Sequence, residues 1–263
     1  MRKLFQQSTY MAATVNSVTP SLCSFYQNGL PTFTYLKHFH TGSLLGSCWN
    51  CGRTLERCTF FCECGKIQQI SKECNYFDLF GYEKPFAVLN RIELSNRMKA
   101  FQRRIHPDKY ANASHYEISL ASIASSLINH AYSTLQSPED RFEYILQLRG
   151  FPQPSNLHPG GDAEFLSTIM DLNEDVQRIV HSFSVPNSEH VGMYDLIARV
   201  VSTVNENVQK FNRAVSNHLD GEEWEQARHE LSRLKYFLRI LDNLREYQRE
   251  INNIGIRLPS YPN

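Results

Sequence analysis

Residues 91–110 read RIELSNRMKAFQRRIHPDKY, an amphipathic pattern that runs into a proline-containing turn. Apolar residues recur at steps of four, three and four, which places them on one face of a helix: Leu94, Met98, Phe101 and Ile105. Asn90 is a favourable N-cap for this helix. Pro107 ends the helix, because proline disfavours helical backbone at the residue before it and has no amide hydrogen to donate. The pattern predicts one helix that ends at about residue 105.

A second helix of similar length is predicted from about residue 115 to residue 136. Its face toward the first helix is expected to contain Ile123, Leu127 or Ile128, Ala131 and Leu135. Ser137 and Pro138 then restart helical structure as N-cap and first-turn residues, and Gly150 is a suitable residue to end this short helix. A short aromatic helix is expected upstream, at residues 76–80.

The remainder of the chain continues the helical pattern. Residues 151–161 contain three prolines and two glycines and are expected to be a linker. Three further helices are predicted at about residues 162–181, 189–219 and 222–254, and the last two must form an antiparallel hairpin because their connection is so short. The sequence therefore predicts an all-α fold. It has a helical hairpin in residues 75–150 and a C-terminal three-helix bundle in residues 162–263.

Composition and charge narrow the class of protein. The chain has 263 residues with 27 basic and 27 acidic side chains, and 41% of its residues are hydrophobic. These values exclude a disordered chain, a fibrous protein and a strongly basic nucleic-acid binder. A run of about 18 apolar residues does not occur, so no membrane-spanning helix is expected. Residues 1–46 contain no acidic side chain, which is typical of a mitochondrial transit peptide; a disordered polar leader is the alternative.

Six of the seven cysteines lie in residues 47–74. Two close pairs can supply four thiolates to a tetrahedral zinc ion: Cys48, Cys51, Cys62 and Cys64. The second pair is separated by one residue instead of two, and Cys58 is close enough to compete as a ligand. Cys74 and Cys23 are expected to be isolated apolar residues and not ligands. In a reducing compartment zinc is favoured over disulfides, so a small zinc-binding module is predicted, with metal-free cysteines as the alternative.

The turn after the first long helix consists of His106, Pro107 and Asp108. A basic helix face precedes it, formed by Arg97, Lys99, Arg103 and Arg104. Residues 91–110 contain six basic and two acidic side chains, a net charge of +4. A rigid turn beside a basic face suits an acidic groove on a partner protein; a solvated helix face is the alternative. The sequence has no nucleophile elbow, Walker loop or dinucleotide fingerprint, so no enzymatic activity is expected.

The turn, the two long helices around it and the segment NHAYSTL at residues 129–135 together resemble a J-domain over about residues 75–150. The resemblance implies that the partner is a DnaK-type heat-shock chaperone, and that the turn stimulates ATP hydrolysis by that chaperone. The segments CWNCG at residues 48–52 and FFCECG at residues 60–65 are similar to the N-terminal zinc module of the animal mitochondrial HscB co-chaperones. In that family the second cysteine pair has two intervening residues, so this chain departs from the pattern there.

Residues 165–174 and 234–238 are similar to the cargo-binding helices of the HscB family, which hold IscU, the scaffold for iron-sulfur cluster assembly. The resemblance places Leu166, Met170 and Tyr236 at the apolar contact positions; the alternative is that they face their own core. Residues 162–181 carry five acidic side chains against one arginine, which favours a basic cargo surface.

Together the resemblances imply a co-chaperone of iron-sulfur cluster assembly in the mitochondrial matrix. Its partners would be a DnaK-type chaperone and an IscU-type scaffold, without nucleic acid or membrane. A general J-domain adaptor with a zinc module, which delivers unfolded clients, is the alternative.

Overall fold

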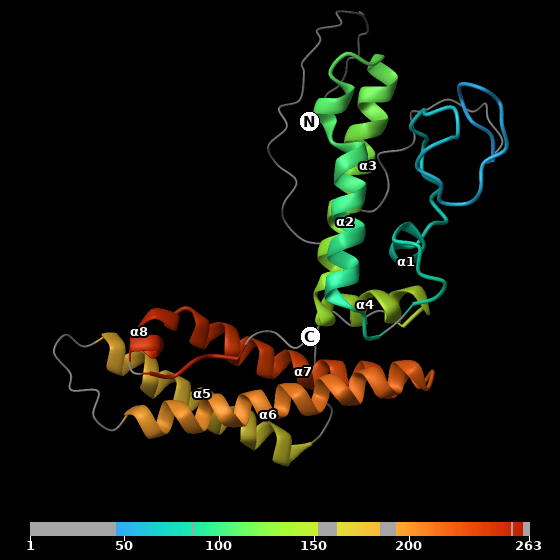
Figure 1. Ribbon diagram of the computed structural model, residues 1–263. Coiled ribbons are helices and arrows are strands. Elements are labelled where there is room, and N and C mark those ends of the chain that lie inside the picture. Colours follow the sequence, from blue (N-terminus) through green and yellow to red (C-terminus); the bar gives the residue numbers. More distant parts are fainter. Residues whose placement is uncertain (1–45, 86, 152–161, 185–192, 254, 260–263) are drawn as a thin grey trace, which may run out of the picture. The chain divides into compact units, whose positions relative to one another are not determined.

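The computed structural model describes residues 46–85, 87–151, 162–184, 193–253 and 255–259, all of them in one compact unit. Within these ranges the regular secondary structure is helical and contains no strand, which confirms the predicted all-α fold (Figure 1). Two isolated β-bridges occur in the Cys-rich segment, which we define as residues 47–74. The predicted leader at residues 1–46, apart from Gly46, and the predicted linker at residues 151–161, apart from Phe151, lie outside the described residues.

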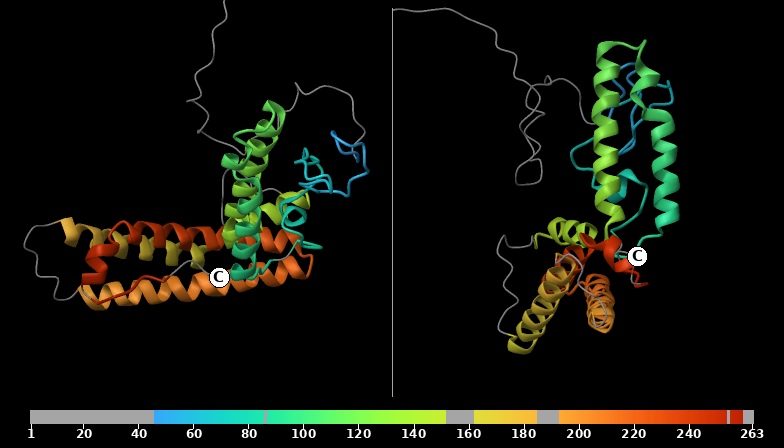
Figure 2. Two further views of the ribbon diagram at one scale, coloured as in Figure 1. Left: turned by 45° about the horizontal axis from the view of Figure 1, so that its top comes forward. Right: turned by 90° about the vertical axis from the view of Figure 1, so that its left-hand side faces the viewer.

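Helices α2 (Arg91–Ile105) and α3 (His115–Gln136) lie side by side and form the predicted hairpin (Figure 2). The Asn90 side chain caps α2 by accepting hydrogen bonds from two amides of the first turn at 3.0 and 3.2 Å. After α2 the chain enters a short 3-10 helix, η2 (Pro107–Tyr110). Both predicted long helices are therefore confirmed, and residues 106–110 lie at the end of the hairpin where α2 passes into α3.

The buried face of α3 matches the prediction toward its C-terminal end and differs from it near Ile123. Three of the predicted residues are buried: Ile128, Ala131 and Leu135. Ile123 is 47% exposed, so its predicted place in the hairpin core is wrong. Ala121 and Ala124 are buried there instead, together with Leu120. Helix separation depends on the side chains at the contact, and alanines let α2 approach more closely than an isoleucine would.

Two short helices complete this region of the chain: α1 (Tyr76–Leu79) and α4 (Pro138–Leu148). The Ser137 side chain caps α4, and Gly150 ends it with a φ of 80°, as predicted. The buried Arg141 of α4 donates a hydrogen bond to the carbonyl oxygen of Ala87 at 2.8 Å. This bond ties α4 to the segment that precedes α2.

The C-terminal helices are α5 (Ala163–Ser184), α6 (Met193–Asp220), α7 (Trp224–Arg245) and α8 (Gln248–Asn253). Helices α6 and α7 form the predicted antiparallel hairpin, and their turn has its positive φ, 58°, at Glu222. The single helix predicted for residues 222–254 is wrong, because the chain breaks at residues 246–247 between α7 and α8. The break lets Tyr247 stack on Phe183 of α5 at a ring-centroid distance of 6.0 Å and buries Ile251.

Aromatic side chains form the centre of the core between α5, α6 and α7. Phe211 stacks on Phe237 at 5.6 Å between ring centroids, and Phe165 meets both rings edge-on at 6.3 and 5.9 Å. Their burial fixes the inner face of α5 and leaves its outer face to solvent. None of the helices described combines the length and the apolar character that crossing a bilayer requires.

Candidate functional site

Four cysteine sulfurs come together in the Cys-rich segment. They belong to the predicted metal ligands Cys48, Cys51, Cys62 and Cys64, and all lie within 4.8 Å of one another. The sulfurs of Cys48 and Cys64 are 3.6 Å apart, as are those of Cys51 and Cys62. A tetrahedral ion with metal–sulfur bonds of about 2.3 Å requires sulfurs about 3.8 Å apart. The four residues can therefore hold one metal ion.

Each cysteine pair lies on a tight turn that ends in a glycine. Gly52 and Gly65 have φ angles of 71° and 81°, which glycine adopts without a Cβ clash. The amide of Gly52 donates to the carbonyl of Cys48 at 2.9 Å, and the amide of Gly65 donates to the carbonyl of Cys62 at 2.9 Å. The second turn is one residue shorter than the first. The shorter spacing of the second pair is absorbed by this turn, so no other residue has to replace a ligand.

Hydrogen bonds to sulfur favour the thiolate at Cys48. Burial raises the pKa of its thiol, but hydrogen bonds from the amides of Cys51 and Asn50 and from neighbouring thiols outweigh this and lower the pKa to about 6. Gln68, only 3% exposed, places its Nε2 3.3 Å from Cys48 Sγ. Metal ions bind the thiolate form, which this environment favours at Cys48. At Cys62 the amide hydrogen bond from Cys64 lowers the pKa, but burial and the side-chain hydrogen bonds of the neighbouring thiols outweigh it and raise the pKa to about 12. Gln68 was not predicted from the sequence, where its signal is a polar amide directly after the apolar Ile67.

A disulfide closes the rest of the Cys-rich segment. Cys58 and Cys74 are bonded, with 5.7 Å between their Cα atoms. Cys58 is therefore not a competing ligand, and the expectation that Cys74 is an isolated apolar residue is wrong. Once four cysteines are assigned to one metal, two remain in the same segment, which was the available signal for a pair. Cys23 lies outside the described residues.

The predicted turn is exposed at the end of the hairpin. The side chains of His106 and Asp108 are 53% and 89% exposed, and His106 Nδ1 lies 3.4 Å from Asp108 Oδ2. The amide of Lys109 donates to the carbonyl of His106 at 3.0 Å, and the hydroxyl of Tyr110 donates to the carbonyl of Arg104 at 3.4 Å. Together with Pro107 at the start of η2, these bonds restrict the turn and present both polar side chains to solvent.

Among the four predicted basic residues, Arg97 has structural partners. Its guanidinium carbon lies 4.4 Å from the centre of the Tyr82 ring, and it donates to the carboxylate of Glu93 at 2.5 Å and to the carbonyl of Phe80. Arg97 therefore holds the connection between α1 and α2 against the hairpin, and less of its hydrogen-bonding capacity faces solvent.

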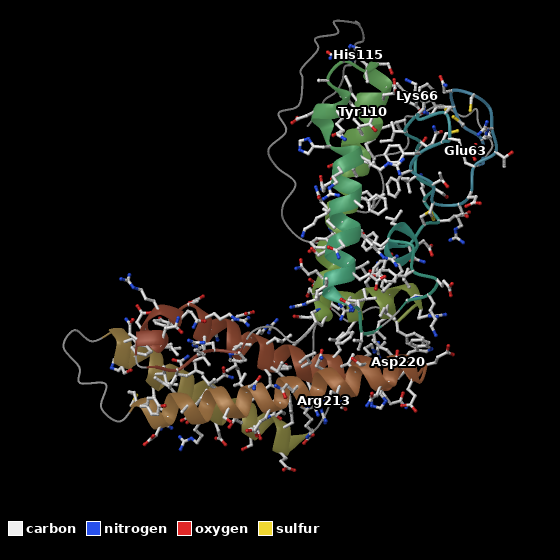
Figure 3. The ribbon with its side chains drawn as sticks, viewed as in Figure 1. Glu63, Lys66, Tyr110, His115, Arg213 and Asp220 are labelled. Carbon is white, nitrogen blue, oxygen red and sulfur yellow. A yellow bond between two sulfur atoms is a disulfide. The ribbon has the colours of Figure 1, made fainter. Side chains whose placement is uncertain are left out.

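The other three predicted basic residues are exposed: Lys99, Arg103 and Arg104. The guanidinium carbon of Arg104 lies 3.9 Å from the centre of the Phe61 ring, which belongs to the Cys-rich segment. Lys66 of that segment lies at the same end of the hairpin as Tyr110 and His115 (Figure 3). Its ammonium donates to the Glu117 carboxylate of α3 at 2.8 Å. The Cys-rich segment and the turn are thus neighbours.

An apolar strip lies on the outer face of α5. Leu166 and Met170 are 39% and 64% exposed. The inner face of the same helix is buried: Phe165, Ile169, Leu172, Val176 and Ile179. Tyr236 of α7 is half-buried and meets Phe165 edge-on at 5.8 Å between centroids. The alternative that these residues face their own core therefore fails for Leu166 and Met170, while Tyr236 is only partly accessible.

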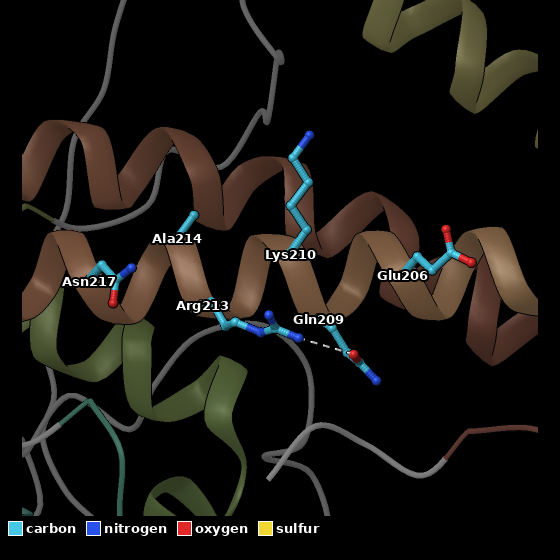
Figure 4. Close-up of a pocket in the computed structure, with 6 residues that line it drawn as sticks. All are labelled: Glu206, Gln209, Lys210, Arg213, Ala214 and Asn217. Carbon is cyan, nitrogen blue, oxygen red and sulfur yellow. Dashed lines mark hydrogen bonds between the residues drawn. The ribbon is translucent and has the colours of Figure 1, made fainter.

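A hollow of about 440 Å³ lies along α6. The residues that line it all come from this helix: Glu206, Gln209, Lys210, Arg213, Ala214 and Asn217 (Figure 4). Arg213 donates a hydrogen bond to the side-chain oxygen of Gln209 at 3.3 Å, so one of its N–H donors already has a partner. The polar lining from one helix differs from the enclosed, mainly apolar clefts that bind small molecules.

Comparison with known proteins places this architecture in a family. Residues 161–245 match the family model described as the HSCB C-terminal oligomerisation domain. The iron-sulfur cluster co-chaperone protein HscB of Mus musculus is 30% identical over 207 residues, which cover 77% of this chain and 83% of the mouse protein. The human protein of the same name is 28% identical over 208 residues, covering 78% and 83%.

Solved structures agree with the sequence comparison. The crystal structure of human co-chaperone protein HscB superposes with a TM-score of 0.63 and 27% identity, over 80% of this chain and 100% of the human one. The chaperone HscB from Vibrio cholerae gives a TM-score of 0.57 and 25% identity, over 68% of this chain and 99% of its own. Since both sequence and fold match over most of each protein, this chain belongs to the HscB family of co-chaperones.

Proposed function

We propose that this protein delivers an IscU-type iron-sulfur scaffold to a DnaK-type heat-shock chaperone in the mitochondrial matrix and stimulates the ATPase of that chaperone. The observation that carries the proposal is the turn at residues 106–108, whose His106 and Asp108 side chains are exposed at the end of a basic helical hairpin in a member of the HscB family. The acid-free leader composition of residues 1–46 supports import into mitochondria.

The turn is suited to bind an acidic surface of the chaperone. Asp108 is exposed and can accept a charge-assisted, bidentate hydrogen bond from an arginine of the partner. Lys99, Arg103 and Arg104 add positive charge beside it, which accelerates association with an acidic surface and disfavours basic ones. ATP hydrolysis takes place in the chaperone. The contribution of this chain is to bind the chaperone and to position the scaffold.

The strip on α5 is suited to hold the scaffold. Leu166 and Met170 project from a helix whose inner face is fully used in its own core, so their exposure has no structural benefit. Exposed acidic residues follow on the same helix, including Asp171 and Glu174. An apolar strip with an acidic border favours a partner that is apolar at its centre and basic around it.

The four cysteines are proposed to bind zinc. Four thiolates in a tetrahedron are a preferred set for this ion, and the sulfur–sulfur distances of 3.6 Å fit it. Such an ion would have no open position for substrate, so its contribution is structural. Elemental analysis of the purified protein should give about one zinc per chain, and none would overturn the assignment.

The test of the proposed function is His106→Gln. We expect it to abolish stimulation of the chaperone ATPase and to leave scaffold binding unchanged, because the turn and the α5 strip are separate surfaces. His115→Gln is the matched control, since this histidine is also exposed and lies just beyond the turn. Undiminished stimulation by the His106 variant would overturn the proposal.

A pull-down distinguishes the scaffold from general clients. Recovery of one iron-sulfur scaffold in a one-to-one ratio supports the proposal. Recovery of diverse unfolded chains, with loss of all of them in the variant Met170→Glu, would instead identify a general adaptor.

A further inference from the structure

The contacts between the Cys-rich segment and the hairpin are made next to the metal ligands. Phe61 directly precedes Cys62, and Lys66 follows Cys64 by two residues. Trp49 directly follows Cys48 and meets Tyr116 of α3 edge-on at 5.2 Å between ring centroids. Their positions therefore depend on the geometry of the four sulfurs.

On the hairpin, the same contacts lie on both sides of the turn. Arg104 precedes His106 by two residues and stacks on Phe61 at 3.9 Å. Glu117 lies in the first turn of α3, is 8% exposed and pairs with Lys66 at 2.8 Å. The hydroxyl of Ser114 also donates to the Glu117 carboxylate at 3.1 Å, so Lys66 supports the cap of α3.

The contact with Phe61 restrains Arg104 without hiding it. A guanidinium stacked on a ring keeps its N–H groups at the edge, where a partner carboxylate can reach them. Arg104 remains exposed despite the contact. A long side chain that is already ordered loses less conformational entropy on binding, so its contribution to affinity increases.

We propose that the Cys-rich segment positions the chaperone-binding end of the hairpin: Phe61 orients Arg104, Lys66 braces the start of α3, and the bound metal holds both in place. This inference rests on the proposed function, because it assigns the segment a role in the same chaperone contact. Phe61 and Lys66 are positioning residues, and the partner is the acidic surface of the chaperone that meets Arg104.

The first experiment measures ATPase stimulation as a function of co-chaperone concentration for Phe61→Leu. We expect the half-saturating concentration to rise roughly two- to tenfold, with an unchanged maximum, because the side chain of Arg104 must then be ordered during binding. Phe61→Tyr should restore the original value, since it keeps the ring. Arg53→Gln is the control within the segment, because Arg53 pairs with Glu63 of the same segment and should have no effect.

A double-mutant cycle tests the connection to Arg104. If Phe61 acts through this guanidinium, Phe61→Leu should add nothing to the effect of Arg104→Gln. Additive effects of the two changes would overturn the positioning role. Metal content is measured for each variant, and a variant that loses its metal is replaced by Lys66→Met, which is expected to raise the half-saturating concentration in the same way.

Hydrogen exchange tests the metal without any activity measurement. Removal of the metal from the full-length protein should accelerate exchange of the amides in residues 104–117 and leave those of α6 unchanged. Unchanged exchange in residues 104–117 would overturn the role of the metal. His106→Gln separates the two proposals: if it abolishes stimulation while Phe61→Leu behaves like the unmodified protein, the proposed function stands and this inference fails.

Discussion

The Cys-rich segment and the helices α5–α7 are held together by different forces. The helices share one aromatic and aliphatic core, in which Phe237, Leu231 and Ile179 are almost completely buried. The Cys-rich segment buries few apolar side chains, chiefly Phe60 and Ile67. A short segment cannot bury enough apolar surface to offset its conformational entropy. It depends in addition on four clustered thiols, on a disulfide and on its contacts with the hairpin.

Because different forces hold them together, the two regions should unfold under different conditions. Chelators, acid and reducing agents act on sulfur, whereas loss of a buried ring acts on apolar packing. Four perturbations probe this difference, in order of their expected effect on stability.

Removal of the metal should have the largest effect. Structural zinc sites of four sulfur or nitrogen ligands contribute on the order of 10 kcal/mol to folding. The variant Cys64→Ser, or a chelator, should therefore remove protection from hydrogen exchange in residues 47–74 and leave α6 and α7 protected. Falling pH should release the metal in the same way, because protons compete for the thiolates. Simultaneous unfolding of α6 and α7 would show that the two regions are not independent.

Truncation of the helical core should have the next largest effect. Phe237 is 1% exposed and contacts both Phe165 and Phe211. Phe237→Ala should lower the free energy of unfolding by about 3–5 kcal/mol, measured by urea denaturation followed by circular dichroism. The metal content of the folded variant should stay unchanged. Loss of metal without loss of helical stability would contradict the comparison.

Opening the disulfide should have a smaller effect, confined to the Cys-rich segment. The bond joins residues 16 positions apart and encloses Cys62 and Cys64. Cross-links that close loops of about this length stabilise by roughly 3 kcal/mol. Cys58→Ser and Cys74→Ser should each weaken metal binding equally, and the double variant should be no worse than either. A reducing agent should affect the unmodified protein but not these variants; unequal single variants would contradict a shared bond.

Local signals in the sequence predicted much of this structure. Asn90, Ser137 and Pro107 define helix ends through their own side chains, so the helix boundaries near them were predicted correctly. The burial of Ile128, Ala131 and Leu135 was also predicted correctly, but that of Ile123 was not, because its hydrophobicity does not say which of two adjacent positions is buried. The break between α7 and α8 was missed for a similar reason, since it depends on Phe183 of another helix.

In the candidate site, too, the features that depend on local sequence were predicted and those that depend on the fold were not. The spacing of the cysteines was sufficient to predict which four sulfurs come together, because the pairs are local. The pairing of Cys58 with Cys74 and the stacking of Phe61 on Arg104 depend on how the segment folds back, which periodicity does not encode. The sequence also left open whether Leu166 and Met170 face solvent. Their side chains are exposed in the structure, while the neighbouring Phe165 is buried.

Substitution of the α5 strip should have the smallest effect on stability. Leu166→Ala and Met170→Ala remove exposed side chains, so each should change the free energy of unfolding by no more than about 0.5 kcal/mol. If the strip holds the scaffold, the pair should weaken scaffold binding by roughly tenfold or more, measured by calorimetry. Gln177→Ala, also exposed on α5, is the matched control. A large loss of stability would mean that these side chains support the core, and full affinity would remove the strip from the scaffold interface. A selective loss of affinity would instead separate the two uses of α5, with its inner face for folding and its outer face for binding.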